Sequence, residues 1–429
     1  MKELKYKHID ETIYTEQLTN GLTVFLLPRP EMSKVYGFFS TNYGSIDQTF
    51  VPLGQEEFIT VPEGVAHFLE HKLFEKEDGD VFNVFSAQGA SANAFTSNTQ
   101  TAYMFTATER IEENIETLID FVQEPYFTDE SVEKEKGIIG QEIQMYMDQP
   151  DHRMYMNMLQ AMFKNHPARQ EVLGTKESVY STTKEDLYTC YETFYHPENM
   201  ILFIAGNFDA PKMMKLIKDN QTAKSFPVMS EIKRHMPEEP KTVATEKQSI
   251  QMNVATPKVM IGIKEYVHEL EKEALMKQNI LQGMLLEHFF SSSGEFYEAL
   301  YDSGLIDNSF TLQKSIEKDH GYSMIGGNTN EPEKFAHQVI ELLKTTKNYQ
   351  LTNEAFERMK KKSIGQVLHS MNSLEYITQE YIHYDRLGFD FFELIPFIQS
   401  LNVEDATVFL ENWISEDRIV ISEVLPLEE

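Results

Sequence analysis

The sequence predicts an α+β protein built of two structurally similar α/β halves, each an antiparallel-rich sheet packed with helices. Three observations lead to this fold class. Strand-like and helix-like segments alternate along the 429 residues, without low-complexity tracts. Short motifs recur in the same order in the second half of the chain. The length leaves room for two to four domains of roughly 100–200 residues each.

The first part of the chain is expected to form strands and then a helix. Leu22–Leu27 and Tyr36–Asn42 are apolar segments of strand length. Pro62 suits the first position of a helix, and it predicts a helix that carries Ala66–Glu75. Asp80 is a candidate N-cap for a second, short helix.

Two further strands and two helices are expected next. Ala90–Thr96 and Thr101–Thr108 are the strands, and residues 109–123 form an amphipathic helix. Asp129 can cap a long helix that runs to about Met147.

A buried strand and a linker are expected to end the first half. Met200–Gly206 is an apolar strand, and a polar, charged stretch with three prolines follows it. The expected division is therefore 1–220 for the first half, 221–247 for the linker and 248–429 for the second half.

The internal repeats indicate an ancient duplication. Phe68–His71 (FLEH) has a counterpart in Leu285–His288 (LLEH), and Ile139–Gln141 (IGQ) recurs at Ile364–Gln366. Single residues match at a constant offset of 215, namely Gly79 with Gly294, Gly89 with Gly304, Asn93 with Asn308, and Phe95 with Phe310. Both halves also end in an apolar strand, the second at Arg418–Val424.

Composition excludes several classes of protein. With 38 basic and 68 acidic residues the net charge is −30, which argues against a nucleic-acid-binding surface. Cys190 is the single cysteine, so an internal disulfide framework is excluded. No run of about 18 apolar residues predicts a membrane span, and the charged N-terminus does not resemble a signal peptide. A cytoplasmic location is therefore expected.

A histidine pair in the first half predicts a metal site. His67 and His71 are four residues apart on the expected helix, so both imidazoles can reach one ion, and Glu70 lies beside them. A catalytic zinc needs a third protein ligand and an open position for water. Glu142 on the long helix is the candidate third ligand. Glu135, two turns earlier on the same face, can orient a ligand or the water.

The second half has lost most of these groups. A lone H-x-x-E-H motif also arises by chance in an acidic chain, so the comparison between the halves matters. His67, Glu135 and Glu142 correspond to Met284, Lys360 and Val367. Glu287 and His288 persist, and they do not suffice for a zinc site. A purely structural role would not explain why one half keeps every ionisable group.

With these motifs the sequence resembles the inverzincin zinc peptidases of the pitrilysin/insulinase family, in particular bacterial single-cassette members similar to mitochondrial processing peptidase. The resemblance covers nearly the whole chain. It is carried by Asn20–Pro28 (NGLTVFLLP), Tyr43–Asp47 (YGSID), Gly64–His71 (GVAHFLEH), Ser91–Tyr103 (SANAFTSNTQTAY), Glu133–Met145 (EKEKGIIGQEIQM) and Tyr195–Asp209 (YHPENMILFIAGNFD).

The resemblance implies a zinc metalloendopeptidase that cleaves peptides or unfolded segments. It implies one Zn²⁺ per chain held by His67, His71 and Glu142, with Glu70 as general base and Glu135 in a supporting catalytic role. It also implies a substrate-binding edge strand in which Asn93, Ala94 and Phe95 contact an extended peptide by β-augmentation.

The resemblance further implies a dimer of clamshell form. Family members carry an Arg and a Tyr in the second half that clamp the substrate, whereas this chain has Tyr301 and Asp307 there. The expected partner is thus a homologous subunit that supplies the Arg/Tyr pair in a heterodimer, with a homodimer as the form in isolation. The alternative function is a non-catalytic peptide-binding or assembly subunit that keeps a structural zinc. The intact Glu70 favours the enzyme, because a structural site needs no base.

Overall fold

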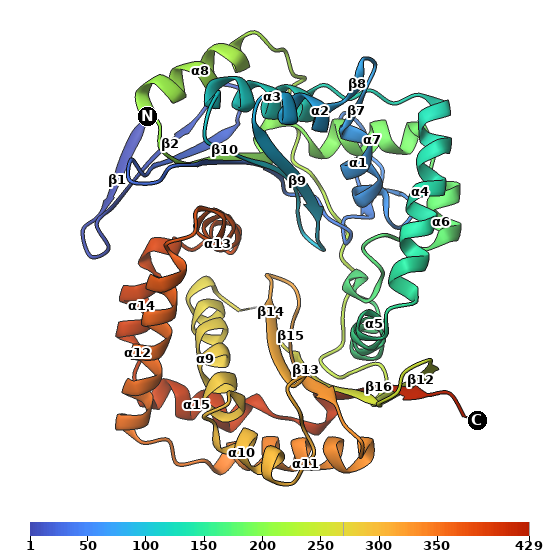
Figure 1. Ribbon diagram of the computed structural model, residues 1–429, viewed down its shortest axis with the longest axis vertical. Helices are drawn as coiled ribbons and strands as arrows, with labels where there is room; N and C mark the ends of the chain where they lie inside the picture. Colours follow the sequence, from blue (N-terminus) through green and yellow to red (C-terminus); the bar gives the residue numbers. More distant parts are fainter. Residues whose placement is uncertain (269, 429) are drawn as a thin grey trace. The chain divides into compact units, whose positions relative to one another are not determined.

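The computed structural model describes residues 1–268 and 270–428, and the chain divides into two compact units. Neither unit is continuous in sequence. The first unit comprises Met1–Gln144, Gln170–Met236 and Ser373–Ile382, and the second comprises Met145–Arg169, Pro237–Asn372 and His383–Glu429. Each unit contains one large sheet covered by helices (Figure 1).

The first unit is built on a seven-stranded sheet of order β1-β2-β3-β11-β4-β10-β9. β11 runs parallel to β3, and all other neighbours in this sheet are antiparallel. The strands are β1 (Lys2–Tyr6), β2 (Glu11–Gln17), β3 (Thr23–Pro28), β4 (Val35–Thr41), β9 (Ala90–Thr96), β10 (Thr101–Ala107) and β11 (Met200–Gly206). Two small hairpins join β5 (Thr49–Phe50) to β6 (Ile59–Thr60) and β7 (Glu75–Lys76) to β8 (Gly79–Asp80).

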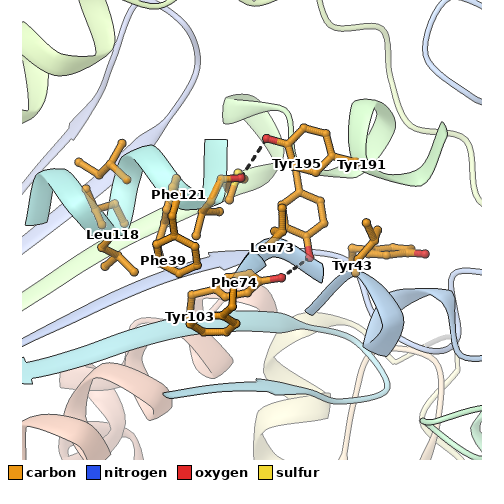
Figure 2. Close-up of a cluster of buried hydrophobic side chains, with 14 of the residues drawn as sticks. Phe39, Tyr43, Leu73, Phe74, Tyr103, Leu118, Phe121, Tyr191 and Tyr195 are labelled. Carbon is orange, nitrogen blue, oxygen red and sulfur yellow. Dashed lines mark hydrogen bonds between the residues drawn. The ribbon is translucent and has the colours of Figure 1, made fainter. Parts of the chain in front are cut away.

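The helices of the first unit include α1 (Val65–Leu73), α2 (Val81–Ala87), α3 (Ile111–Gln123), α4 (Asp129–Met147), α6 (Lys176–Ser181), α7 (Lys184–Phe194) and α8 (Ala210–Thr222). Of these, α1, α2, α3 and α8 pack on one face of the sheet. Alternate strand residues such as Leu26 and Leu202 face these helices and are fully buried. Figure 2 shows part of this core, where the hydroxyls of Tyr103 and Tyr195 hydrogen-bond at 2.8 Å. The hydroxyl of Tyr191 donates a hydrogen bond to the carbonyl of Val122 at 2.9 Å. Each buried phenol thus has a partner, as burial of a polar group requires.

The opposite face of the first sheet is covered by the beginning of α13 (Leu374–Arg386). The ring of Tyr381 lies 5.0 Å from that of Phe25 on β3 and 5.4 Å from that of Phe203 on β11. All three side chains are buried. Glu375 forms an ion pair with Lys34 at 2.5 Å. A segment from late in the sequence therefore completes the core of the first unit.

The second unit repeats the topology of the first on a five-stranded sheet of order β12-β16-β13-β15-β14. β16 is parallel to β12 and the other neighbours are antiparallel, as in the β3-β11-β4-β10-β9 part of the first sheet. The strands are β12 (Lys247–Met252), β13 (Lys258–Glu265), β14 (Thr311–Ile316), β15 (Gly321–Asn328) and β16 (Ile419–Pro426). The helices are α5 (Pro150–Met162), α9 (Lys272–Phe290), α10 (Glu295–Asp302), α11 (Pro332–Thr345), α12 (Asn353–Ser370), α14 (Leu394–Ser400) and α15 (Val403–Trp413). The matching topology confirms the prediction of two similar α+β halves.

Different helices pack against the two faces of the second sheet. On one face, α5 packs on β12, β13 and β16, and the Ser422 hydroxyl donates a hydrogen bond to the Met154 carbonyl at 2.7 Å. On the other, Glu265 at the end of β13 accepts hydrogen bonds from Gln282 on α9 and Trp413 on α15, at 2.9 and 3.0 Å. α5 follows α4 in the first half of the sequence but belongs to the second unit. In the same way, α13 follows α12 in the second half, and its beginning belongs to the first unit. Each half of the sequence therefore supplies a helix that covers the sheet of the other unit.

Most expected elements of the first half form, and their ends show why some boundaries differ. β9 spans the expected residues, and the Asp80 side chain caps α2 by accepting a hydrogen bond from the Phe82 amide. α1 begins at Val65 and not at Pro62, because Gly64 has a left-handed φ of 87°. A Cβ at Gly64 would lie 2.3 Å from the Leu173 carbonyl oxygen, so the site excludes other residues.

Parts of the expected linker are fixed to the first unit. The Val51 amide donates to the Lys233 carbonyl at 2.9 Å, and the His235 amide to the Thr49 carbonyl at 2.8 Å. Arg234 forms an ion pair with Asp47 at 2.7 Å. Composition marks such a segment as polar but does not reveal these specific contacts.

Within residues 1–268 and 270–428, no helix combines the length and apolar character that crossing a membrane requires.

Candidate metal centre and active site

α1 carries His67, Glu70 and His71 in fixed positions. The helix is anchored by Phe68 and Leu69, which are fully buried in the core of the first unit. The two imidazole rings lie one turn apart, with centroids 4.5 Å from each other. The helical register therefore turns both rings to the same side of α1, as the spacing in the sequence predicts.

Glu142 on α4 meets both imidazoles. Its Oε2 atom lies 3.6 Å from Nε2 of His67 and 3.4 Å from Nε2 of His71. Zinc ligands at about 2.0–2.1 Å in tetrahedral geometry are roughly 3.3 Å apart, so both distances to Glu142 are close to the separation that a zinc site requires. The structure thus brings together His67, His71 and Glu142 from two helices.

Glu135 orients one of these imidazoles. It is buried, and its Oε1 atom lies 2.9 Å from Nδ1 of His71. A carboxylate at Nδ1 keeps a ring proton there, so Nε2 is the nitrogen that can lose its proton and bind a metal. This is the hydrogen-bond arrangement that metal-binding histidines ordinarily have. The donor set fits a zinc ion.

The pKa values at this centre differ strongly between the two histidines. Burial, followed by the nearby His71, lowers the pKa of His67 to about 4. Burial also opposes the charged form of His71, but hydrogen bonds to Glu135 and Glu142 raise its pKa to about 9. The hydrogen bond from His71 lowers the pKa of Glu142. One positive charge is thus stabilised between two carboxylates, where a metal cation would replace a proton.

Glu70 has a hydrogen-bond partner that the sequence analysis did not assign. The hydroxyl of Thr96, the last residue of β9, donates to Oε2 of Glu70 at 2.6 Å. Burial raises the pKa of Glu70, and the Thr96 hydrogen bond opposes that shift. Strand alternation places Thr96 on the same face as Ala94, the face that packs against the helices. This alternation is the signal in the sequence that could have identified Thr96.

The expected substrate strand is an edge strand. β9 pairs with β10 on one side and ends the seven-stranded sheet on the other. The Asn93 side chain turns back and accepts a hydrogen bond from the Ala94 amide at 2.9 Å. The ring of Phe95 lies on the opposite face, 6.2 Å from that of Phe38.

In the second unit, the residues that correspond to the histidine–glutamate centre make other contacts. Glu287 on α9 pairs with Lys362 at 3.0 Å and accepts a hydrogen bond from Gln366 at 2.9 Å. His288 Nε2 lies 3.2 Å from the Tyr349 hydroxyl. Lys360, the counterpart of Glu135, donates to the backbone carbonyls of Gln399 and Leu401 at the end of α14. The Glu287 contacts hold α12 against α9, and among the described residues this place has no metal ligand set.

Tyr301 and Asp307 stand where the resemblance implies an Arg/Tyr pair. Tyr301 on α10 is 57% exposed. Asp307 accepts a hydrogen bond from the Ser309 amide at 2.8 Å, which stabilises a turn before β14.

A second group with metal-ligand side chains occurs in the second unit, at His166, Asp319 and His320. Its hydrogen bonds argue against a metal. Nδ1 of His166 accepts a hydrogen bond from the Ala168 amide at 3.1 Å, so in the neutral ring the proton is on Nε2. That nitrogen faces Asp319 at 3.6 Å and has no free lone pair for an ion. His320 Nδ1 binds the same carboxylate at 2.7 Å. The group is a carboxylate shared by two imidazoles.

The fold and the histidine–glutamate centre define a class of metallopeptidase, and comparison with known proteins assigns the chain to a family. A model described as Insulinase (Peptidase family M16) matches residues 60–176, and one described as Peptidase M16 inactive domain matches residues 181–363. The chain belongs to peptidase family M16.

Relatives and solved structures match along the whole chain. The chain is 45% identical over 427 residues to the uncharacterized zinc protease YmfH of Bacillus subtilis (strain 168), covering 99% of each. It is 40% identical to an M16-like peptidase structure from Alicyclobacillus acidocaldarius, with a TM-score of 0.93 over 97% of this chain and 99% of that one. A Helicobacter pylori protease shares the fold at 16% identity, with a TM-score of 0.83 over 96% and 99%.

Proposed function

We propose that this chain is a zinc metalloendopeptidase that hydrolyses peptides or unfolded segments. The observation that carries the proposal is the centre formed by His67, His71 and Glu142, with Glu70 on the same helix and Glu135 behind His71. A structural zinc site has no need of a free carboxylate next to its ligands.

His67, His71 and Glu142 would hold one zinc ion. A zinc ion in such a site supplies a Lewis acid that polarises the scissile carbonyl and lowers the pKa of water. Glu70 would take a proton from the attacking water and pass it to the leaving amine. Glu135 would keep His71 in the tautomer that binds metal.

We infer that the free edge of β9 binds the substrate as an added strand. Opposing residues in an antiparallel pair alternate between bonded and unbonded pairs, and Ser97 bonds to Gln100 at the turn. In this register Ala94 and Tyr103 form an unbonded pair, so the main-chain groups of Ala94 point away from β10. A peptide carbonyl could take the Ala94 amide in place of the Asn93 side chain. Asn93 and Phe95 would then contact the peptide through their side chains.

The two halves would have different functions in this proposal. Residues 1–220 would form the zinc-binding half, and residues 248–429 would form a homologous half without metal ligands, joined by the linker 221–247. Because Tyr301 and Asp307 replace the expected clamping pair, the active form would be a heterodimer with a homologous chain that supplies Arg and Tyr.

The same replacement favours a second candidate function. A chain without the clamp could serve as a peptide-binding or assembly subunit in which zinc is structural. Glu70 distinguishes the two, because the structural role does not require a carboxylic acid there.

The test compares zinc content with peptide hydrolysis for the wild type and Glu70→Gln, with the homologous partner present. The substitution keeps the shape and removes the base, so zinc should stay at one per chain while hydrolysis falls by about 10²-fold or more. A chelator should abolish hydrolysis by the wild type, and added zinc should restore it. Equal activity of the wild type and Glu70→Gln would contradict the assigned role.

A further inference from the structure

Thr96 connects the expected substrate strand to the expected general base. It is the last residue of β9, and Glu70 lies on α1. Its hydroxyl donates to Oε2 of Glu70 at 2.6 Å, a length typical of a hydrogen bond to an ionised carboxylate. β9 packs against α1, so both groups are held by rigid elements of one unit.

This contact orients the carboxylate. Within residues 1–268 and 270–428, Thr96 is the hydrogen-bond partner of Glu70, and Oε1 of Glu70 has none. One oxygen is therefore fixed by the protein, and the other remains available to accept a proton. A glutamate side chain has three rotatable bonds, and without a partner its carboxylate could turn away from the water. Threonine is restricted at χ1, so it holds its hydroxyl in one direction.

The position of Thr96 also links orientation to substrate binding. Ala94, whose amide we assign to the substrate, precedes Thr96 by two residues on the same strand. A peptide that adds to the edge of β9 would fix the strand and, through it, the Thr96 hydroxyl.

We propose that Thr96 is a positioning residue, whose hydroxyl holds Oε2 of Glu70 so that Oε1 faces the attacking water. This inference rests on the proposed function, since it assumes that Glu70 is the base. Thr96 itself touches neither the water nor the peptide carbonyl.

The test uses Thr96→Val, which keeps the shape and removes the hydroxyl, and Thr96→Ser, which restores it. Thr222→Val at the end of α8 is the matched control, because among the described residues its hydroxyl bonds to the Lys218 carbonyl of its own helix and to nothing else. In Thr96→Val, kcat should fall about 10- to 100-fold with KM nearly unchanged, the effect of losing one charge-assisted hydrogen bond in the transition state. Zinc content should not change, and Thr96→Ser should recover most of kcat.

Crystal structures of the zinc-free variants give a readout that does not depend on activity. Glu70 should adopt a different rotamer in Thr96→Val and the original one in Thr96→Ser. An unchanged Glu70 conformation in Thr96→Val, or a kcat within about twofold of the wild type, would overturn the proposal. If the wild type does not cleave peptides at all, the proposed function fails, and the Glu70 conformation still decides whether Thr96 orients it.

Discussion

His71 shows how much of the centre depends on single contacts. Its two ring nitrogens have different partners, Glu135 at Nδ1 and Glu142 at Nε2. His67 also contacts Glu142 through Nε2, but its Nδ1 has no hydrogen-bond partner among the described residues. The centre therefore contains one histidine whose Nδ1 is held by a carboxylate and one whose Nδ1 is not.

His67→Ala should abolish stoichiometric zinc binding and leave the fold intact. The substitution removes one of three ligands, and the core of the first unit lies on the other side of α1. Metal analysis and circular dichroism measure the two effects. His337→Ala, at an exposed position on α11, should keep its zinc. Full zinc occupancy in His67→Ala would show that the ligand assignment is wrong.

His166 should make stability depend on pH. Burial lowers the pKa of His166 in spite of Asp319, so the folded state keeps it neutral where the unfolded state, with a pKa near 6.5, takes up a proton. The unfolded state then binds more protons, and stability falls as the pH drops below about 6.5, by at most about 1.4 kcal/mol per pH unit from this group.

His166→Asn keeps an acceptor for the Ala168 amide and removes the titrating ring. Urea unfolding of both proteins between pH 5 and 8 should show a weaker pH dependence for the variant. Parallel stability curves for the two proteins would mean that His166 is not the group responsible.

Residue types and their spacing predicted which side chains would meet at this centre but not their hydrogen bonds. The spacing of His67 and His71 follows from helix geometry, and the structure places Glu142 next to them. The Thr96–Glu70 bond and the contact between His166 and Asp319 depend on how distant segments pack. A single sequence contains no direct record of such packing.

Among the elements, β9 and α13 show two different outcomes. β9 matched its expected range because turn residues bound it on both sides. α13 could be expected as a helix, but nothing in its own residues says which sheet it covers. Its contact with Phe25 and Phe203 arises from the topology of the duplicated halves.

Tyr381→Ala should destabilise the first unit by about 3 kcal/mol, because it leaves a cavity between α13 and the sheet. The midpoint of urea unfolding, followed by circular dichroism, measures the change. Val408→Ala on α15 removes an exposed side chain and should have little effect. A similar midpoint for Tyr381→Ala and the wild type would contradict a packing role for α13.

For the molecule as a whole, the testable question is whether one chain is sufficient. If Tyr301 and Asp307 leave the clamp incomplete, the isolated chain should bind zinc and show little peptidase activity. Mixing with a homologous chain that carries Arg and Tyr but lacks the zinc ligands should raise hydrolysis by at least about tenfold. Light scattering and mass spectrometry identify the species. Vigorous cleavage by the isolated chain, with no partner present, would refute the heterodimer.

Because α13 comes late in the sequence, the first unit cannot complete its core until most of the chain has been synthesised. All residues of the proposed zinc centre have been synthesised once Glu142 has, yet the aromatic face of the first sheet stays open until residues 373–382 follow. A nascent chain would therefore expose Phe25 and Phe203 from the synthesis of β11 until that of α13. Such a surface attracts chaperones and promotes aggregation. A message truncated after the first half would thus encode every proposed zinc ligand and still yield a chain for quality control to remove.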